Sequence, residues 1–450
     1  MKKYLPPIVV AVASAITHFI YFGYPAQVVF DETFAGNFLG NYANGTFYFD
    51  VHPPLAKIIV YLFGFLTGAS YQGNMGAIGD SLLHSIVLLR LVPIVCGFLL
   101  PLVVYAISRN IGLSQMSSMT AGFLVAIENS LVVQSRFILF DIMLVLSGFV
   151  AVLLYQEYRK RMGKEKPAAR RTFLFGSAVF AAAAFSIKWT GLAFPLMIVV
   201  FEWLALYRDQ TVGSLWKRSL AVARSIIPFI ASYVCVGLVM YVGIFAVHFA
   251  MLPRPGPGDA FMSQQFQQEG FAAKLADLNV EMYKANAYQM PSHQYQSSWW
   301  SWPLMLRPIF YWQGQEGQDE YIYLLGNPFV YWLGTASVAT MIGYALWKRK
   351  KSERKAALSF ILIGFLVNYV PFMFITRAMF LYHYEPALIM SIIAIAWIID
   401  GIYWKKWRIV ALIATLILCF SSFIYFSPLT YGLHLTDGQL NARMWLSGWR

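Results

Sequence analysis

The sequence predicts an all-helical protein that crosses a membrane many times, and three observations support this fold class. Of the 450 residues, 59% are hydrophobic and only 12% are charged, whereas soluble domains have about 45–50% apolar and about 25% charged residues. The mean hydropathy is +0.57. Several apolar runs also approach the roughly 20 residues that a helix needs to cross the hydrocarbon core. Lipid is therefore the main solvent of this chain.

Eleven apolar stretches are predicted to span the membrane. The first follows Lys2 and Lys3 and lacks a small-residue cleavage pattern, so we expect it to be retained. The stretch from Leu55 to Leu66 is short for a span and is expected to lie flat at the interface. The predicted spans are residues 4–22, 83–107, 116–133, 139–156, 173–187, 190–207, 225–250, 328–347, 356–375, 380–400 and 409–426.

The charges between these spans predict an orientation with the N-terminus inside. Most of the 34 Lys and Arg then fall on the inner side, at Lys2, Lys3, Arg109 and residues 159–171, 208–224, 348–355 and 405–408. Cytoplasmic loops carry such an excess, so the net charge of +13 does not call for a nucleic-acid partner. The C-terminus and two long segments, 23–82 and 251–327, are then outside. We treat residues 1–450 as one domain with these two outer loops.

Charged residues in or beside the spans are costly in lipid, which makes them candidates for function. In the predicted orientation a set of them lies near the outer leaflet and is expected to converge on one polar cavity. The alternative is a set of interhelical salt bridges that only hold the bundle together. The set comprises Asp31, Glu32, Asp50, His52, Arg90, Arg136, Asp141, Lys188, Arg377, His383 and Glu385.

The acidic pair Asp31-Glu32 directly follows the aromatic exit of the first span. Partial desolvation raises the pKa of a carboxylate, which enables it to accept a proton from a weak nucleophile. The alternative is an ordinary helix N-cap with an acidic first turn. On spacing alone, the cap interpretation is favoured.

Asp50 and His52 lie on a turn that Pro53 and Pro54 stiffen, just before the interfacial stretch. We expect both side chains at the membrane surface, where they support the first outer loop. A divalent metal is a less favoured alternative, because it would need further ligands that the sequence does not supply. The three cysteines lie in apolar runs and form no CxxC or Cys/His cluster. They therefore indicate no disulfide framework or zinc site, and no cofactor is firmly predicted.

Four basic residues on different spans suit the phosphate of a lipid-linked ligand, whose charge must be neutralised at the headgroup boundary. They are Arg90, Arg136, Lys188 and Arg377. For Lys188 and Arg377 the alternative is snorkelling without a ligand. Tyr382 and His383 follow Arg377 and form an aromatic, hydrogen-bonding patch suited to a sugar ring. Trp299 and Trp300 fit the headgroup level of the second outer loop.

Taken in order, these motifs resemble the protein O-mannosyltransferases, a family of multi-span glycosyltransferases of the GT-C class. The resemblance covers nearly the whole chain. It rests on Phe30-Asp31-Glu32, Asp50 to Lys57, Gln134 to Leu139 with Asp141, Ile187 to Gly191, Trp299 to Leu304 with Arg307-Pro308, Arg377 to Tyr384, and Arg443 to Leu446.

The resemblance implies a GT-C fold of about eleven spans and the transfer of mannose from a polyprenyl-phosphate carrier to Ser or Thr hydroxyls of translocated proteins, with inversion. It implies that Asp31 is the general base and that Glu32 supports acceptor binding or geometry. Arg90 matches a position thought to be essential. Trp299 and Trp300 are expected to contact the acceptor or the rest of the outer loop. The expected partners are the lipid-linked donor, Ser/Thr-containing proteins, the bilayer and the secretion machinery.

One departure from the family's pattern concerns the second outer loop. Eukaryotic members insert a β-trefoil module there, for which 251–327 has no room, so the chain resembles the compact prokaryotic type. We therefore expect a bacterial or archaeal plasma membrane. Two rival functions remain: a GT-C transferase that moves another lipid-linked sugar to a lipid or glycan, and a non-enzymatic lipid-linked sugar flippase.

Overall fold

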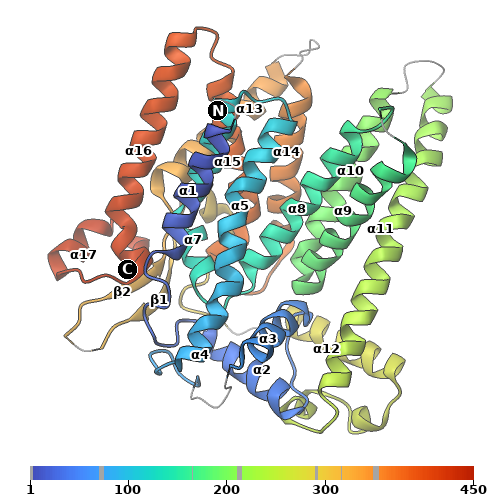
Figure 1. Cartoon of the computed structure of the whole chain (residues 1–450), viewed down its shortest axis with the longest axis vertical. Coiled ribbons are helices and arrows are strands. Elements are labelled where there is room, and N and C mark those ends of the chain that lie inside the picture. Colours follow the sequence, from blue (N-terminus) through green and yellow to red (C-terminus); the bar gives the residue numbers. More distant parts are fainter. Residues whose placement is uncertain are drawn as a thin grey trace.

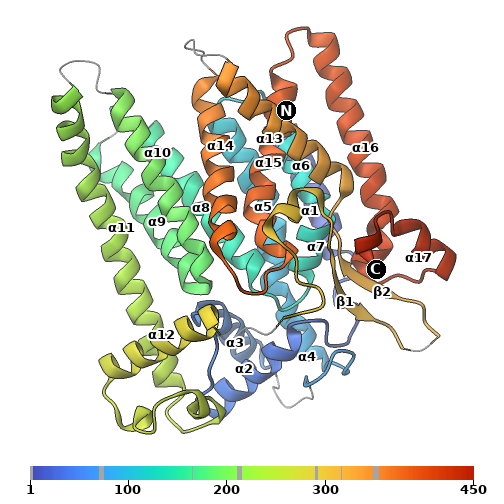
Figure 2. The same ribbon diagram turned by 180° about the vertical axis from the view of Figure 1, so that it is seen from behind.

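The computed structural model describes residues 4–69, 75–164, 166–209, 215–288, 292–315, 317–347 and 354–450. Its long helices run side by side, and short helices gather at one end of the bundle (Figures 1 and 2). The long helices are α1 (Leu5–Phe19), α5 (Leu91–Asn110), α6 (Gln115–Ala126), α7 (Asn129–Arg136), α8 (Asp141–Lys160), α9 (Pro167–Ile187), α10 (Ala193–Asp209), α11 (Leu215–Met251), α13 (Pro328–Trp347), α14 (Lys355–Tyr369), α15 (Glu385–Asp400) and α16 (Lys405–Tyr431).

The remaining elements in the described ranges are five further helices, of 4 to 18 residues, and two strands. They are α2 (Glu32–Asn44), α3 (Leu55–Thr67), α4 (His84–Val87), α12 (Phe271–Tyr288) and α17 (Asp437–Arg443), with strands β1 (Ile309–Gln313) and β2 (Tyr321–Leu324). Single 3-10 turns are η1 (Leu88–Arg90), η2 (Trp189–Leu192), η3 (Pro257–Phe261), η4 (Phe266–Gln268), η5 (Trp299–Leu304), η6 (Val370–Phe374), η7 (Leu381–Tyr384) and η8 (Ser447–Trp449).

The predicted multi-pass membrane protein is confirmed. Within the described ranges, eight helical segments are long and apolar enough to cross a membrane, and the pair α6 and α7, bent by 53°, adds a ninth. Helix α1, with 15 residues, is shorter. The number of eleven spans therefore stays a prediction. Of the predicted inner charges, Lys2, Lys3 and residues 348–353 lie outside the described residues.

The bend between α6 and α7 falls at a buried acid within the stretch predicted as one span. The Glu128 carboxylate accepts hydrogen bonds from the backbone N–H of Leu131 at 2.8 Å and of Asn327 at 2.7 Å. It thereby caps α7 and joins it to the segment before α13, which satisfies a polar group that would be costly to bury alone. Helix α7 is then free to diverge and carry Arg136 toward the first outer loop.

Helices α2 and α3 of the first predicted outer segment and α12 of the second form one layer at one end of the bundle (Figure 1). The Phe47 N–H donates to the Arg254 carbonyl at 2.9 Å, and the Gly258 N–H donates to the Phe47 carbonyl at 3.0 Å. A Cβ on Gly258 would lie 2.5 Å from the backbone of Tyr48 and Phe49, so only glycine permits this approach. Helix α12 belongs to the second outer segment. Helix α3 lies with α2 in this layer, and its depth in the interface stays a prediction.

The sequence analysis missed a β-hairpin in the second outer segment. Strands β1 and β2 pair antiparallel, with Ile309 opposite Leu324. Their aromatic and β-branched residues favour strands and were a usable signal. The Trp312 indole N–H donates to the Gln27 side-chain carbonyl at 2.9 Å, so the hairpin also holds the first outer loop.

Candidate functional site

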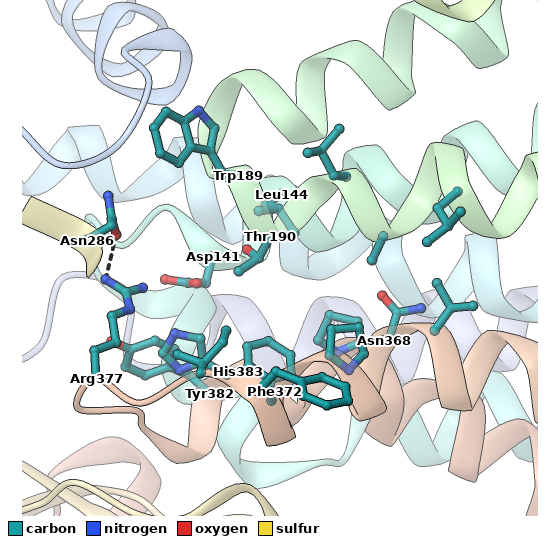
Figure 3. A pocket seen from close by; sticks show the side chains of 18 of the residues that line it. Asp141, Leu144, Trp189, Thr190, Asn286, Asn368, Phe372, Arg377, Tyr382 and His383 are labelled. Atoms are coloured by element: carbon teal, nitrogen blue, oxygen red, sulfur yellow. Dashed lines mark hydrogen bonds between the residues drawn. The ribbon is translucent and has the colours of Figure 1, made fainter. Parts of the chain in front are cut away.

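A cavity of about 740 Å³ opens between α8, α10, α12, α14 and the chain from η6 to α15 (Figure 3). One part is polar and includes Asp141, Thr190, Asn286, Arg377, Tyr382 and His383. The remainder is mostly apolar and includes Leu144, Leu192, Leu196, Val367, Phe372 and Ile375. The cavity therefore has a charged end and an apolar end, as an amphipathic ligand requires.

Lys188 and Asp141 form an ion pair beside the polar end. The Lys188 ammonium lies 2.7 and 2.8 Å from the two carboxylate oxygens of Asp141. Asp141 is the first residue of α8, and Lys188 follows α9 in extended backbone. The same ammonium lies 5.0 Å from the centre of the Tyr382 ring. The Asp141 carboxylate therefore largely compensates the positive charge of Lys188. Lys188 can still polarise a ligand, but it adds little net charge to the cavity.

Arg377 supplies a second cation at the polar end. One terminal nitrogen donates to the Asn286 side-chain oxygen at 2.6 Å (Figure 3). Its other N–H groups have no partner within the described part of the chain. Tyr382 and His383 lie next to it along the cavity wall with their rings stacked at 4.6 Å. The arrangement leaves part of a guanidinium fork and an aromatic face for a ligand.

Asp31 is half-buried and faces the same charges. Burial raises the pKa of its carboxyl to about 7; Lys188 opposes this rise, while Asp141 and Asp50 add to it. Although Asp31 is the N-cap residue of α2, its side chain makes no capping hydrogen bond, and no other partner for it exists among the residues described. Asp31 thus occupies the N-cap position with Glu32 in the first turn, as the alternative interpretation expects, but its side chain does not serve as a cap. A free carboxylate that titrates near neutrality suits proton transfer.

The backbone just before Asp31 is held in an unusual conformation. Phe30 has φ of 48°, a left-handed value that is rare for a bulky residue. Its ring stacks on Tyr311 of β1 with centroids 4.1 Å apart, and its N–H donates to the Tyr311 carbonyl at 3.2 Å. The hairpin thus determines how Asp31 is presented, a constraint typical of functional sites.

Glu32 differs completely from its neighbour. Its carboxylate is fully buried and accepts two hydrogen bonds from Arg90, at 2.6 and 2.9 Å. It also accepts the backbone N–H groups of Val29 and Ile138, each at 2.9 Å. Every lone-pair direction is thus used by the protein itself. These four bonds fit the predicted role of Glu32 in supporting the geometry of the site, which stays a prediction.

Arg90 and Arg136 do not line the cavity. Arg90 is fully buried and also donates to the carbonyls of Pro25 and Gln27, each at 2.7 Å. Arg136 donates to the carbonyls of Ile20 at 2.9 Å and Tyr24 at 2.8 Å. Most of their donors thus bind backbone carbonyls, although the Arg136 Nε has no hydrogen-bond partner in the described structure. Contact of either arginine with a ligand phosphate stays a prediction. We name Glu32, Arg90 and Arg136 the sealed cluster, and Asp31, Asp141, Lys188 and Arg377 the open cluster.

The turn with Asp50 and His52 approaches the open cluster from the first outer loop. Lys57 forms an ion pair with the Asp50 carboxylate and donates to the His52 carbonyl at 2.9 Å. Burial, followed by the charges of Lys188, Lys57 and Arg377, lowers the pKa of His52 well below its ordinary value. His52 is therefore a neutral group near these cations, in line with a supporting role.

Trp299 and Trp300 lie on η5, outside the residues that line the cavity. Trp299 is partly buried, and its carbonyl accepts the Tyr369 hydroxyl at 3.1 Å. Trp300 is 59% exposed. Acceptor contact therefore stays a prediction for both. Glu385, also in the predicted set, is fully buried and has no hydrogen-bond partner for either oxygen in the described structure.

Sequence reasoning missed polar residues of the cavity, among them Asn368 on α14 and Asn286 on α12. The Asn286 amide donates to the Val51 carbonyl at 2.7 Å and accepts from Arg377. A single asparagine in a weakly periodic outer segment gave no signal. Across the described ranges, no three His, Cys, Asp or Glu side chains gather as a metal site would require.

Comparisons with known proteins agree over nearly the whole chain. The sequence profile described as dolichyl-phosphate-mannose-protein mannosyltransferase matches residues 8–252, and that of the C-terminal four-TMM region of protein-O-mannosyltransferase matches residues 271–449. Dolichyl-phosphate-mannose–protein mannosyltransferase 4 of Candida albicans is 32% identical over 61% of this chain and 37% of its own length. Protein O-mannosyltransferase 1 of Drosophila melanogaster is 35% identical over 56% of this chain and 28% of its own length. The chain thus spans about a third of these relatives.

The fold agrees with solved structures. The Saccharomyces cerevisiae protein O-mannosyltransferase Pmt1-Pmt2 complex bound to the sugar donor superposes with a TM-score of 0.89 at 20% identity, covering 100% of this chain and 93% of that chain. ArnT from Cupriavidus metallidurans bound to undecaprenyl phosphate gives 0.55 at 14% identity, covering 91% and 63%. The predicted GT-C fold is confirmed. With a family profile that matches more than half of its residues, the chain belongs to the protein O-mannosyltransferase family.

Proposed function

We propose that this chain is a membrane glycosyltransferase that moves mannose from polyprenyl-phosphate mannose to Ser or Thr hydroxyls of translocated proteins. The observation that carries the proposal is the unpartnered Asp31 carboxylate near the polar end of a cavity that Arg377 and Asp141 line, with Lys188 paired to Asp141 beside it. The names of the relatives support the substrate class. The apolar end of the cavity suits the polyprenyl chain.

The donor is proposed to bind with its phosphate at the open N–H groups of Arg377 and within reach of the field of Lys188. A charge-assisted hydrogen bond to phosphate is roughly twice as strong as a neutral one, which favours this end for the anion. The mannose ring would lie against Tyr382 and His383. The sealed cluster has no role in this scheme other than to hold the first outer loop.

The proposed reaction is a single displacement. The Ser or Thr oxygen attacks the anomeric carbon of mannose as the bond from that carbon to the phosphate oxygen breaks, and the electron pair leaves with the phosphate. The hydroxyl proton passes to the Asp31 carboxylate. Arg377 and Lys188 stabilise the charge that the phosphate gains. One displacement inverts the anomeric configuration.

The site is proposed to face the outside of a prokaryotic plasma membrane, with the N-terminus in the cytoplasm. Most Lys and Arg lie in the loops that would then be inside, which is the usual bias. Acceptors would meet the site as they emerge unfolded from the secretion machinery. A cysteine introduced into the 251–327 segment should react with a membrane-impermeant maleimide in intact cells.

The decisive assay uses the purified full chain in lipid nanodiscs, with labelled polyprenyl-phosphate mannose and a Ser/Thr peptide. The peptide should become labelled, its Ser/Thr→Ala counterpart should not, and a chelator should leave the rate unchanged. Comparing the anomeric configuration of donor and product by NMR tests inversion. Label transferred only to a lipid or glycan would favour the rival transferase. Donor that crosses a bilayer without being consumed would favour the flippase.

A further inference from the structure

One asparagine connects three outer segments that are far apart in the sequence. The Asn286 amide nitrogen donates to the Val51 carbonyl at 2.7 Å and to the Met282 carbonyl of its own helix at 2.8 Å. Its oxygen accepts from Arg377 at 2.6 Å. Val51 lies between Asp50 and His52 in the first outer loop. The second outer loop is therefore tied through one side chain to both the supporting turn and the cavity cation.

The polarity of this amide is fixed by its neighbours. A primary amide has two N–H donors and one carbonyl acceptor. Because both donors of Asn286 point at backbone carbonyls, the oxygen must face Arg377, as Figure 3 shows. An aspartate would set an oxygen against the Val51 carbonyl and a negative charge against Arg377. A leucine of similar size would make none of the three bonds.

The bond to Asn286 restrains the Arg377 side chain without using up its donors. Arg377 lines the cavity and is half-buried. With one nitrogen held, the plane of the guanidinium is fixed, and its remaining N–H groups stay available to an anion. Such pre-organisation reduces the conformational entropy that ligand binding must otherwise cost.

A second asparagine on α12 provides a built-in comparison. Asn279 lies seven residues before Asn286, two turns away on nearly the same face. Its oxygen accepts from the Tyr241 hydroxyl at 2.6 Å, and that hydroxyl accepts the Trp189 indole N–H at 3.0 Å. Asn279 therefore docks the same helix against the bundle through neutral groups. Among the described residues it makes no hydrogen bond to Arg377 or to the Asp50–His52 turn.

We propose that Asn286 is a positioning residue for the donor phosphate. It holds the Arg377 guanidinium in the orientation that binds the phosphate. Through the Val51 carbonyl it also fixes the position of the Asp50–His52 turn relative to that guanidinium. The inference rests on the proposed function, since it assumes a phosphate-bearing lipid in the cavity. It differs from a role in docking α12, which Asn279 performs without a hydrogen bond to that cation.

The test measures the affinity of the nanodisc-embedded full chain for polyprenyl phosphate without a sugar. Asn286→Leu should weaken binding about tenfold, the effect of one lost hydrogen bond to a charged group. Asn279→Leu should change it less than twofold. On an Arg377→Gln background, Asn286→Leu should have no further effect, because the group through which it acts is gone. Equal weakening by both leucine variants, or an undiminished effect on that background, would overturn the proposal.

The inference remains testable if Asn286→Leu does not fold. Asn286→Asp keeps the shape and places a carboxylate on Arg377, so it should also weaken phosphate binding at least about tenfold; unchanged affinity would overturn the proposal. Transfer assays separate this inference from the function. Wild-type chain that binds polyprenyl phosphate but labels no peptide contradicts the proposed function alone. Normal transfer and normal phosphate affinity in both Asn286 variants contradict the inference alone.

Discussion

The sealed cluster and the open cluster contain the same kinds of side chain at the same end of the molecule, yet they are arranged for opposite purposes. In the sealed cluster, the Glu32 carboxylate accepts four hydrogen bonds from N–H groups of the protein itself. In the open cluster, Asp31 has no partner among the described residues and Arg377 uses only one nitrogen. An ion network whose hydrogen bonds are all made within the protein fixes geometry, whereas donors and acceptors that have no protein partner beside a cavity can bind a ligand.

The largest effect is expected from Asp31→Asn. The amide cannot accept the hydroxyl proton, so the kcat for mannosyl transfer to peptide should fall about 10²- to 10⁴-fold. The unfolding temperature should not fall, because the carboxylate makes no bond that the amide would break. The measurement is single-turnover transfer with labelled donor. A variant that retains the wild-type rate would remove Asp31 from the chemistry.

The next largest effects are expected from one arginine substitution in each cluster, which should change different properties. Arg377→Gln should raise the donor KM about 10- to 100-fold, because charge-assisted bonds to the phosphate are lost. Arg136→Gln should instead lower the unfolding temperature, because it removes the donors that hold the Ile20 and Tyr24 carbonyls. Steady-state kinetics and thermal unfolding of both variants give the answer. An equal rise of donor KM in folded Arg136→Gln would mean that the sealed cluster also contacts the donor.

The pH dependence tests whether the open cluster acts as an electrostatic unit. With the Asp31 pKa raised to about 7, the base is active when deprotonated, so the rate should increase as pH rises through neutrality. Lys188→Met removes the cation that opposes the raised pKa of Asp31, and it leaves the negative charge of Asp141 without its ion-pair partner. Both changes favour the protonated acid, so the midpoint should move about one unit higher. A midpoint that stays in place, or moves lower, would show that Lys188 does not act on the base.

The smallest effect is expected outside both clusters, at Trp300. Its exposed ring is predicted to contact the acceptor, so Trp300→Ala should raise the peptide KM about fivefold. The donor KM should not change, since Trp300 does not line the cavity. Titration of peptide and donor in separate series separates the two constants. A change confined to the donor KM would refute acceptor contact.

Much of the fold was predictable because lipid imposes strong rules on sequence. Long apolar runs must form helices, and the positions of Lys and Arg indicate which loops share a side. The hairpin of β1 and β2 was missed because two short aromatic runs in a loop carry little periodicity. The close approach at Gly258 depends on a segment that lies about 200 residues earlier in the chain.

The division between the clusters could not be predicted from the sequence. Asp31 and Glu32 are adjacent and chemically alike, so their separate fates depend on partners brought from elsewhere. Arg90 and Ile138, which seal Glu32, lie 58 and 106 residues further along the chain. Charge and predicted depth grouped Arg90 and Arg136 with Lys188 and Arg377, but depth alone does not determine which donors face a backbone carbonyl and which face a cavity.

The central claim is that of two adjacent acids one performs chemistry and the other maintains the fold. The most direct test measures kcat and unfolding temperature side by side for Asp31→Asn and Glu32→Gln. We predict a stable, inactive Asp31→Asn chain and a Glu32→Gln chain that is destabilised by about 3–5 kcal/mol, because it leaves Arg90 buried with a broken ion pair. A stable but inactive Glu32→Gln chain, together with an active Asp31→Asn chain, would contradict the account.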